Sequence, residues 1–513
     1  MSAFEKSQPH MATEIVFSES QYTQLYAHLF QENGDEQAAF AFVSPVVKEN
    51  KVRLLVHHIV ELQPEHFASQ SGAFLHVEKS TAIAIAQHAL DNQWGLVDIH
   101  SHPFANDHVG FSSIDTSYAL PRFRWFAEKA QRAFPHTMLV FGKNSVDGLI
   151  YDPDTDSMRK IDSVTILSSP IRRFWIAQPE SALTDSAYLN RTARQVQAFG
   201  EHGQAQIAAL TVGIVGLGGV GSSVAHQLAL LGVRKFVLVD ADTVEATNLN
   251  RLIGASLQDA IDKVPKVHVL ERAIKQIDPS AKIHSHRDMF PTADTVDALK
   301  QVDVLFGCTD THGSRLLLNE FSLQYILPYI DIGVGIDSDA AGQIREAGGQ
   351  FRVLLPGRFC LQCIRAVDAD QAARDLLPAE MRSVHRARGY IPAEDIPAPS
   401  VGFLNGTLAC LAVGEFLNLI TGFQEPSDIV YYFLKGQTMK RVRATRDVEC
   451  VACGKNGRLA AGDLEPVLGL SAMSVRIETV PLPSSPSDLD ASQDSSAADR
   501  AQSEATEWEQ GQC

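Results

Sequence analysis

The sequence is poor in positive charge and in long hydrophobic runs, and each scarcity narrows what the chain can be. It has 44 Lys and Arg against 61 Asp and Glu, which gives a formal net charge of −17. Nucleic-acid binding is driven by basic groups that neutralise phosphates, so this balance argues against a nucleic-acid backbone as the main partner. The longest apolar run, residues 407–420, carries Glu415 and is too short to span a bilayer. We therefore expect neither nucleic acid nor a membrane as partner.

A secretory signal is not expected either, because residues 1–10 lack a basic segment followed by an apolar one. We therefore expect a cytoplasmic protein. The chain has only seven cysteines, and four of them form two C-x-x-C pairs. In a cytoplasmic chain that spacing favours a metal site over disulfides.

The length of 513 residues exceeds what one hydrophobic core usually serves. Up to residue 168, strand-like runs alternate with helical ones, so we predict one compact α/β domain over residues 1–168. The expected strands cover residues 38–43, 52–60, 96–100, 137–141 and 148–151, and the expected helices cover residues 21–30, 81–90 and 116–133.

The rest of the chain is predicted to form a linker, a second domain and a tail. Residues 169–186 show no core pattern and are the predicted linker. Over residues 187–470 strands alternate with helices to about residue 420, which predicts a largely parallel sheet covered on both faces. Residues 471–513 are the predicted tail; within it, residues 481–512 hold seven acidic groups against one arginine. Such a segment buries too little apolar surface to offset its ordering entropy, so we expect it to be disordered.

The most informative segment is the glycine-rich turn G-L-G-G-V-G at residues 216–221, which lies between an apolar strand and a predicted helix. Its glycines allow close approach of a phosphate, towards which the helix N-terminus directs free N–H groups. The glycines are Gly216, Gly218, Gly219 and Gly221. Asp240 closes the next apolar strand, where an acid can hold a ribose hydroxyl. The segment predicts a nucleotide site, but such turns also occur in dehydrogenases, flavoproteins and methyltransferases.

Residues downstream of the turn discriminate among those classes. Asn248 and Arg251 follow Asp240, Lys266 begins a predicted helix, and Asp310 follows a later apolar strand. Together they would surround a triphosphate with two cations, an amide and a carboxylate that binds Mg²⁺. This set is suited to displacing pyrophosphate, because fixed cations meet the charge that develops on the phosphate oxygens. Any one of these cations alone would be read as a solvated surface charge.

These motifs resemble the ThiF/MoeB superfamily, to which the ubiquitin-activating enzymes belong, over roughly residues 187–460. The matching residues are Arg194-Gln195, the glycine-rich turn, Asp240-Ala-Asp242, Asn248-x-x-Arg251, Lys266, Cys308-Thr-Asp310 and the two C-x-x-C pairs. The resemblance implies a Rossmann-like domain in which ATP adenylates the C-terminal glycine of a ubiquitin-like protein. It implies a phosphate-binding role for Asn248, Arg251 and Lys266.

The same resemblance assigns further roles and a quaternary structure. Asp240 would hold the ribose, with Asp242 in the same nucleotide-binding segment, and Asp310 would bind Mg²⁺. Arg194 would act as an arginine finger in the site of a neighbouring subunit. Because the chain has one such domain, the resemblance implies a homodimer.

The two C-x-x-C pairs are Cys360/Cys363 and Cys450/Cys453, and each has the spacing of a zinc knuckle. Four thiolates leave no open coordination position for catalysis, so we predict structural Zn²⁺. A redox-active pair is the alternative, although neither pair lies in a thioredoxin-like βαβ setting.

The remaining cysteines bear on whether the chain forms a thioester. Superfamily members that do so usually carry a cysteine in the loop before the helix that here covers residues 401–420, and residues 381–405 contain none. Cys410 lies inside the apolar pattern of that helix, so we predict that it is a core residue. Cys308 is also predicted to be buried, and Cys513 ends the tail. The sequence thus supports adenylation, while a covalent relay stays open.

A second site is predicted in the first domain, where His100 and His102 end an apolar strand and Asp115 begins a helix. Residues two apart on a strand point to the same side, so both imidazoles can bind one cation with Asp115 as third ligand. Three protein ligands leave a fourth position for water, which is typical of catalytic zinc. A carboxylate must then take the proton of that water; Glu36 is our candidate, with Glu32 nearby.

The pattern H-x-H-P-x8-S-x-x-D resembles the JAB/JAMM (MPN⁺) metalloproteases over about residues 12–155. That resemblance implies a cytidine-deaminase-like α/β fold and cleavage after the C-terminal glycine of a ubiquitin-like protein. It gives Glu36 the role of general base and Ser112 the stabilisation of the oxyanion. The alternative for Ser112 and Asp115 is a helix capping box.

Both domains therefore point to the C-terminus of a ubiquitin-like protein. The first would trim or release it with Zn²⁺, and the second would adenylate it with ATP and Mg²⁺. A conjugating enzyme in a bacterial-type conjugation pathway would be a further partner. Sulfur-carrier activation for cofactor or metabolite biosynthesis, a scaffold with an inert first domain, and a dinucleotide oxidoreductase are the alternatives.

Overall fold

A computed structural model describes residues 11–48, 51–130, 135–177, 185–339, 341–387 and 399–470. The predicted acidic tail, residues 471–513, lies outside the described residues, and so does Cys513. Contacts divide the described chain into two compact units. The smaller comprises Gln24–Pro45 and His58–Ile161, and the larger comprises residues up to Thr23, Val46–His57 and Asp162–Leu470. The domain boundaries that we infer from the sequence stay a prediction.

The first sheet has nine strands in the order β11-β10-β1-β3-β2-β6-β7-β8-β9. They are β1 (Ala12–Ser18), β2 (Ala38–Lys48), β3 (Lys51–Glu61), β6 (Gly95–Ser101), β7 (His136–Phe141), β8 (Val146–Asp152), β9 (Ser157–Lys160), β10 (Ser163–Leu167) and β11 (Arg172–Trp175). The strands β4 (Phe67–Ser71) and β5 (Phe74–Val77) form a separate antiparallel hairpin. The five predicted strands are confirmed within β2, β3, β6, β7 and β8, whereas the sequence pattern predicts none of the others.

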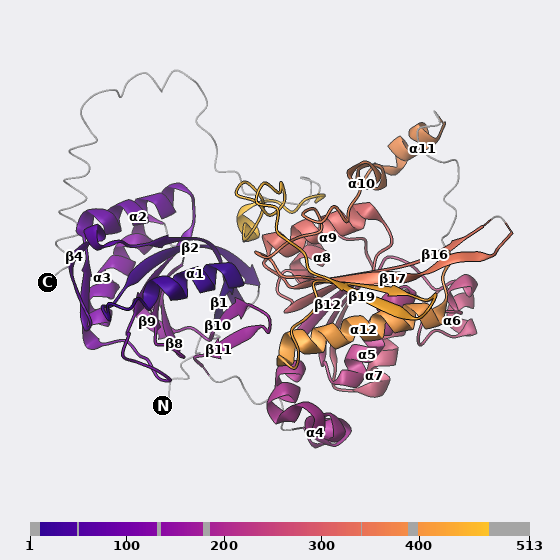
Figure 1. The fold of residues 1–513 in the computed structure, drawn as a ribbon, viewed down its shortest axis with the longest axis horizontal. Helices are drawn as coiled ribbons and strands as arrows, with labels where there is room; N and C mark the ends of the chain where they lie inside the picture. The colour runs from indigo at the N-terminus through magenta and orange to yellow at the C-terminus, as the bar shows by residue number, and fades with distance from the viewer. Residues whose placement is uncertain are drawn as a thin grey trace, which may run out of the picture. The chain divides into compact units, whose positions relative to one another are not determined.

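Helices α2 (Lys79–Asp91) and α3 (Ser113–Lys129) pack against this sheet in the smaller unit (Figure 1). Phe40 and Phe42 of β2 share one core cluster with Ala86 of α2 and Phe126 of α3. The helix predicted at residues 116–133 begins earlier, because Ser112 caps it by accepting a hydrogen bond from the backbone of the third helical residue. The unit also contains the 3-10 turn η1 (Pro64–His66), and α1 (Glu19–Leu29) follows β1.

The second sheet lies in the larger unit and is mixed, with the order β14-β13-β12-β15-β16-β17-β18-β19. Its pairs are parallel from β14 to β16 and antiparallel from β16 to β19. The largely parallel sheet expected from the sequence is therefore found only in the first half, because β16 and β17 are joined directly with no crossover helix. The strands are β12 (Thr211–Val215), β13 (Lys235–Val239), β14 (Lys282–His286), β15 (Val304–Gly307), β16 (Tyr329–Ser338), β17 (Ile344–Leu354), β18 (Ile429–Phe433) and β19 (Thr438–Val442).

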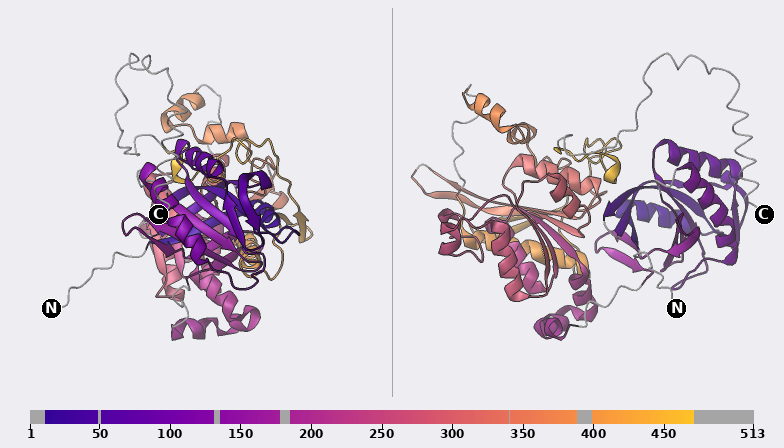
Figure 2. Two further views of the ribbon diagram at one scale, coloured as in Figure 1. Left: turned by 90° about the vertical axis from the view of Figure 1, so that its left-hand side faces the viewer. Right: turned by 180° about the vertical axis from the view of Figure 1, so that it is seen from behind.

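Helices cover both faces of the second sheet, as strand–helix alternation predicts. Figure 1 shows α5, α7 and α12 on one face and α8 and α9 on the other, and the reverse view in Figure 2 agrees. The helices of this unit are α4 (Ser186–Ala209), α5 (Gly219–Leu231), α6 (Leu257–Ile261), α7 (Lys266–Ile277), α8 (Ala293–Leu299), α9 (His312–Gln324), α10 (Ala369–Asp375), α11 (Ala379–Ala387) and α12 (Gly402–Thr421), with the 3-10 turns η2 (Ala246–Asn248) and η3 (Gly462–Leu464).

Helix α12 extends beyond the apolar run at residues 407–420 and corrects the expectation for Cys410. At 20 residues the helix is long and apolar enough, by length and composition only, to cross a membrane. In this structure α12 packs on α5 and on β16 and β17, which accounts for its composition. Leu404 and Leu408 line its buried face. Cys410 is exposed rather than in the core, because two residues along a helix turn a side chain about 200° away from Leu408.

Candidate nucleotide and metal sites

The glycine-rich turn lies at the carboxyl end of β12, where the chain enters α5. β12 pairs in parallel with β13 on one side and with β15 on the other. The chain that leaves β12 leads to β13 on one side, whereas β15 lies on the other side. The connections to these two neighbours therefore run in opposite directions from the end of β12. Open α/β sheets bind ligands at such switch points, so the fold itself favours a site here.

Two glycines of the turn differ in what surrounds them. Gly216 has φ +86°, and a Cβ there would lie 2.8 Å from the carbonyl oxygen of Cys308. A side chain is therefore excluded at Gly216 both by conformation and by space. A Cβ added at Gly218 would have no neighbouring atom within 4 Å. Gly218 is also the N-cap residue of α5, and no side chain caps the helix there. The open space beside the N–H groups at the start of α5 is suited to a phosphate.

Asp240 links the turn to the end of β13. Its Oδ2 accepts a hydrogen bond from the backbone N–H of Leu217 at 2.6 Å, and its Oδ1 accepts one from Asp242 at 2.8 Å. Burial raises the pKa of this carboxyl, and Lys266, whose Nζ is 3.9 Å from Oδ1, opposes that effect. Each carboxylate oxygen can accept more than one hydrogen bond, so a ribose hydroxyl can still bind.

Two cations lie beside these groups. Lys266 is buried at the start of α7, and its Nζ is 2.7 Å from Asp242 Oδ2. Arg251 donates to the carbonyl oxygen of Thr247 at 2.7 Å. A Cβ on Gly219 would lie 3.2 Å from Arg251 Cδ, so this side chain runs along the turn.

Three further residues are predicted for the nucleotide site, and they differ in their contacts with the glycine-rich turn. Asn248 Oδ1 accepts from the backbone of Glu245 at 3.1 Å, which leaves its amide N–H groups for other partners. Asp310 is exposed after β15, on a loop tied to β12 by the bond from Cys308 N to Val215 O. Arg194 is exposed on α4, and among the described residues no hydrogen bond or ion pair links it to the turn.

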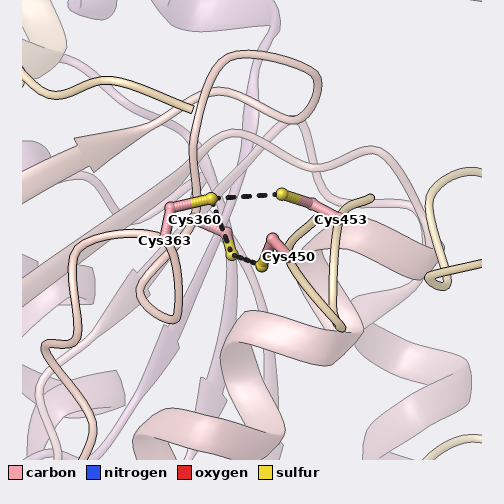
Figure 3. A group of neighbouring side chains, drawn as sticks. All are labelled: Cys360, Cys363, Cys450 and Cys453. Carbon is pink, nitrogen blue, oxygen red and sulfur yellow. Dashed lines mark hydrogen bonds between the residues drawn. The ribbon is translucent and has the colours of Figure 1, made fainter. Parts of the chain in front are cut away.

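The four cysteines of the C-x-x-C pairs meet at one point (Figure 3). The Sγ–Sγ distances are 3.6 Å for Cys360–Cys450, 3.3 Å for Cys363–Cys453 and 3.8 Å for Cys360–Cys363. Sulfurs about 2.3 Å from a tetrahedral zinc are about 3.8 Å apart, so this donor set fits Zn²⁺. None of the four is in a disulfide.

The second candidate site lies in the smaller unit. One ligand atom each from His100, His102 and Asp115 lies within 4.8 Å of the others. β2 and β6 pair antiparallel with Ala38 opposite His100, and continuing this register sets Glu36 opposite His102. Glu36 Oε1 is 3.7 Å from His102 Nε2, whereas Glu32 is exposed on the turn after α1.

Asp115 serves two purposes at the start of α3. Its Oδ2 is 3.7 Å from Nε2 of both His100 and His102. The same oxygen accepts from the backbone of Ser112 at 2.6 Å, and Ser112 Oγ accepts from the backbone of Asp115 at 3.1 Å. The capping box is therefore present, and it leaves Asp115 beside the imidazoles.

The electrostatics of this cluster favour a bound cation. His100 Nε2 is buried without a hydrogen-bond partner. Burial raises the pKa of Asp115, but His100 and the hydrogen bonds from Ser112 outweigh it and hold that pKa at about 2. Burial raises the pKa of Glu36 to about 7. Two imidazoles and one carboxylate are ligand types that zinc binds in proteins. In a tetrahedral zinc site, neighbouring nitrogen and oxygen donors are about 3.3 Å apart.

A pocket of about 1120 Å³ adjoins this cluster. The sequence pattern did not indicate Asp98 and Arg122, which line the pocket, or His136, which contacts Asp98. Arg122 donates from Nη2 to Asp98 Oδ2 at 2.8 Å, and His136 Nε2 is 2.9 Å from Asp98 Oδ1. Burial lowers the pKa of His136 despite Asp98. Arg122 follows Asp115 by seven residues on α3, and this spacing places both on one face of the helix. The spacing could have indicated Arg122 from the sequence.

Known proteins match the larger unit. The model of the ThiF family matches residues 190–452. "Protein HesA, vegetative" of Trichormus variabilis is 29% identical over 280 residues, 53% of this chain and 92% of that protein. The "SAMP-activating enzyme E1" of Haloferax volcanii is 24% identical over 55% of this chain and 95% of its own. The "Ubiquitin-like modifier-activating enzyme 5" of Dictyostelium discoideum is 26% identical over 44% of this chain and 56% of its own.

Proposed function

Because the chain belongs to the ThiF family, we propose that it adenylates the C-terminal glycine of a ubiquitin-like or sulfur-carrier protein, with ATP as the second substrate. The observation that carries the proposal is the meeting of an open helix N-terminus at Gly218 with an acid and two cations at one sheet edge. The acid is Asp240, and the cations are Arg251 and Lys266. Two of the relatives are named as activating enzymes, which supports the same reaction class.

The reaction follows from this arrangement. A carboxylate oxygen of the carrier attacks the α-phosphorus of ATP, an acyl–phosphate bond forms, and the bond to the β-phosphate breaks to release pyrophosphate. Arg251 and Lys266 meet the charge that develops on the phosphate oxygens, and Asp240 holds the ribose. Asp310, exposed beside the turn, would hold Mg²⁺, which neutralises phosphate charge when bound.

Arg194 requires a second copy of the chain in this proposal. It is exposed and lacks a link to the turn of its own chain, so we assign it to the site of a partner subunit in a homodimer. It would add a third cation as pyrophosphate leaves. A guanidinium supplied in this way makes each site depend on the assembled dimer.

The test is ATP–pyrophosphate exchange that depends on a carrier with a C-terminal glycine. Asp310→Ala should abolish exchange, because phosphate charge is then left without its metal. His102→Ala, in the other unit, should exchange at the wild-type rate and is the matched control. Absence of exchange with carriers of both classes, ubiquitin-like and sulfur-carrier, would contradict the proposal.

A second activity is proposed for the smaller unit: metal-dependent hydrolysis of the bond that follows the same glycine. The cluster of His100, His102 and Asp115 with Glu36 alongside supports it. Zn²⁺ held by the three ligands would supply a polarised water. Glu36 takes the proton of that water and returns it to the leaving nitrogen, and the Ser112 hydroxyl donates a hydrogen bond to the oxyanion.

This second activity is tested on a carrier fused to a C-terminal extension. The zinc-loaded protein should release the extension, and His102→Ala should not, while His102→Ala still supports ATP–pyrophosphate exchange. Equal cleavage by the wild type and His102→Ala would remove the hydrolase from the proposal.

The Cys360–Cys363–Cys450–Cys453 site is proposed to hold structural Zn²⁺, since all four positions are filled by thiolates.

A further inference from the structure

The pocket of the smaller unit extends well beyond the three candidate metal ligands. Helix α3 lines it over two turns, with Asp115 at one end, Tyr118 between and Arg122 at the other. An α-helix rises about 1.5 Å per residue, so the seven residues from Asp115 to Arg122 span about 10 Å. The pocket is therefore long enough to hold several residues of extended chain beside the metal site.

A fixed guanidinium marks the far end of this pocket. Arg122 Nη2 donates to Asp98, which is buried and also held by His136. The contacts with Arg122 and His136 occupy the two carboxylate oxygens of Asp98, one each, and this fixes the guanidinium in place. A guanidinium has five N–H donors, and its bond to Asp98 uses one. Arg122 lines the pocket with its side chain 28% exposed, so donors remain for a ligand.

The wall between the two ends carries apolar as well as polar side chains. It includes Phe74 of β5, Ile114 and Pro121 of α3, and Met138 of β7. A ligand that fits this pocket thus places a reactive bond at the metal site, apolar atoms along the middle, and an anionic group at Arg122. A planar guanidinium with free N–H groups is the residue best matched to a carboxylate, with which it forms paired charge-assisted hydrogen bonds.

We propose that Arg122 binds the terminal carboxylate of a short peptide extension that follows the scissile glycine. The inference rests on the hydrolase activity proposed above and names its substrate class, an unprocessed carrier precursor. Extended chain advances about 3.3 Å per residue, so about three residues bridge the span of roughly 10 Å. A lysine conjugate offers no free carboxylate there, because its acceptor chain continues in both directions.

The test compares three peptides with the zinc-loaded full-length protein. The first ends in Gly-Gly-Leu-Ala-Leu with a free carboxylate, the second is its C-terminal amide, and the third carries Gly-Gly on the side chain of an internal lysine. We expect the KM of the acid to be at least about tenfold below that of the amide, the usual size of a charge-assisted bond. Equal KM values, or preference for the lysine-linked peptide, would overturn the inference.

Variants separate binding of the carboxylate from structural effects. Arg122→Gln should raise the KM of the acid to that of the amide with kcat unchanged, and Arg122→Lys should fall between. The matched control is Arg124→Gln, whose side chain pairs with Asp156 outside the pocket. If Arg122→Gln fails to fold, Arg122→Lys decides the outcome: an unchanged acid-to-amide ratio in that variant would count against the inference, since the paired geometry of the guanidinium is lost.

A binding measurement distinguishes failure of this inference from failure of the hydrolase. Full-length Glu36→Gln keeps the pocket and lacks the proposed base, so calorimetry can compare the acid and the amide without turnover. Preference for the acid that disappears in Glu36→Gln/Arg122→Gln supports the inference even if the wild type hydrolyses none of the peptides. Hydrolysis of acid and amide alike, with equal binding, overturns the inference and leaves the hydrolase intact.

Discussion

Glu36 Oε1 lies 3.7 Å from Nε2 of His102, and the two residues lie just beyond the paired ends of β2 and β6. The register there, with Ala38 opposite His100, brings the two chain segments together, so the proposed base is positioned next to strand pairing. We expect Glu36→Gln to keep bound zinc and to lower the cleavage rate of a carrier fusion by roughly 10²–10⁴-fold, as loss of a general base does. Zinc is measured by mass spectrometry and cleavage by electrophoresis.

The matched control for this substitution is Glu32→Gln. Glu32 is the alternative base of the sequence pattern, but its side chain is exposed on the preceding turn. The Glu32→Gln protein should cleave the carrier fusion at the wild-type rate. A strong loss in Glu32→Gln with little change in Glu36→Gln would reverse the assignment.

The cysteine cluster gives a prediction about metal content. The described residues contain two groups of side chains that could hold a metal ion, so we expect the zinc-loaded wild type to hold about two ions per chain. Cys363→Ser should lose one ion and lower the midpoint of thermal unfolding, since a structural zinc contributes directly to folding. Cys410→Ser, which alters an exposed thiol outside the cluster, should keep both ions and the wild-type midpoint. Retention of both ions by Cys363→Ser would argue against the four-thiolate site.

Glu14 gives a prediction about acid stability. This buried carboxylate lies 3.1 Å from Arg173 and 3.4 Å from Arg53. Burial raises its pKa, but Lys51, Arg173 and Arg53 outweigh burial and hold the pKa well below its ordinary value of 4.5. The stabilisation is therefore complete above pH 4.5 and is lost as the pH falls towards the lower folded value.

Substitution of Glu14 should reveal this dependence. Glu14→Gln should lower the free energy of unfolding at pH 7 by about 3–5 kcal/mol, because it removes the carboxylate that faces the buried Arg53, while Arg173 keeps Asp303. It should also flatten the decline below pH 4.5. Urea unfolding at several pH values measures both. Glu271→Gln, which breaks a helix-surface pair with Lys275, should cost roughly 0.5 kcal/mol and serves as control. An acid profile of Glu14→Gln parallel to that of the wild type would contradict the prediction.

The assignment of Arg194 to a partner subunit predicts complementation between two inactive variants. Arg194→Ala and Asp310→Ala should each lack ATP–pyrophosphate exchange. After their subunits are mixed and allowed to reassemble, half of the dimers are mixed and each has one intact site, so activity should recover to about a quarter of the wild type. No recovery, despite demonstrated subunit exchange, would show that Arg194 does not act across an interface.

The strands that could be predicted are those with local signals. Apolar alternation bounded by turn residues identifies the cores of β2, β3 and β6, which the structure extends by a few residues. β1 and β10 escape prediction, although they pair in parallel with Glu14 opposite Ser163. Their partners lie far apart in the chain, and periodicity within a short window carries no information about such pairing. Cys410 was misjudged for a related reason: an apolar helix does not reveal which of its faces another element covers.

The candidate sites were predictable where the motif itself fixes geometry. C-x-x-C spacing and H-x-H on a strand bring their ligands together through local backbone, so the sequence indicates both clusters. Arg122, Asp98 and His136 come from a helix and two strands, and only the fold brings them into contact. The meeting of Asp240 with Leu217 at the turn likewise depends on the parallel register of β12 and β13.

The capping box of Ser112 and Asp115 has a consequence for how a metal would enter and leave. The side chain of Asp115 is already oriented by the helix start, so ion binding costs little rotamer entropy at this ligand. Departure of the ion leaves the first turn of α3 closed by its own hydrogen bonds. Exchange with free zinc should therefore proceed without unfolding this helix, and occupancy of the site would follow the supply of metal rather than the folding history of the chain.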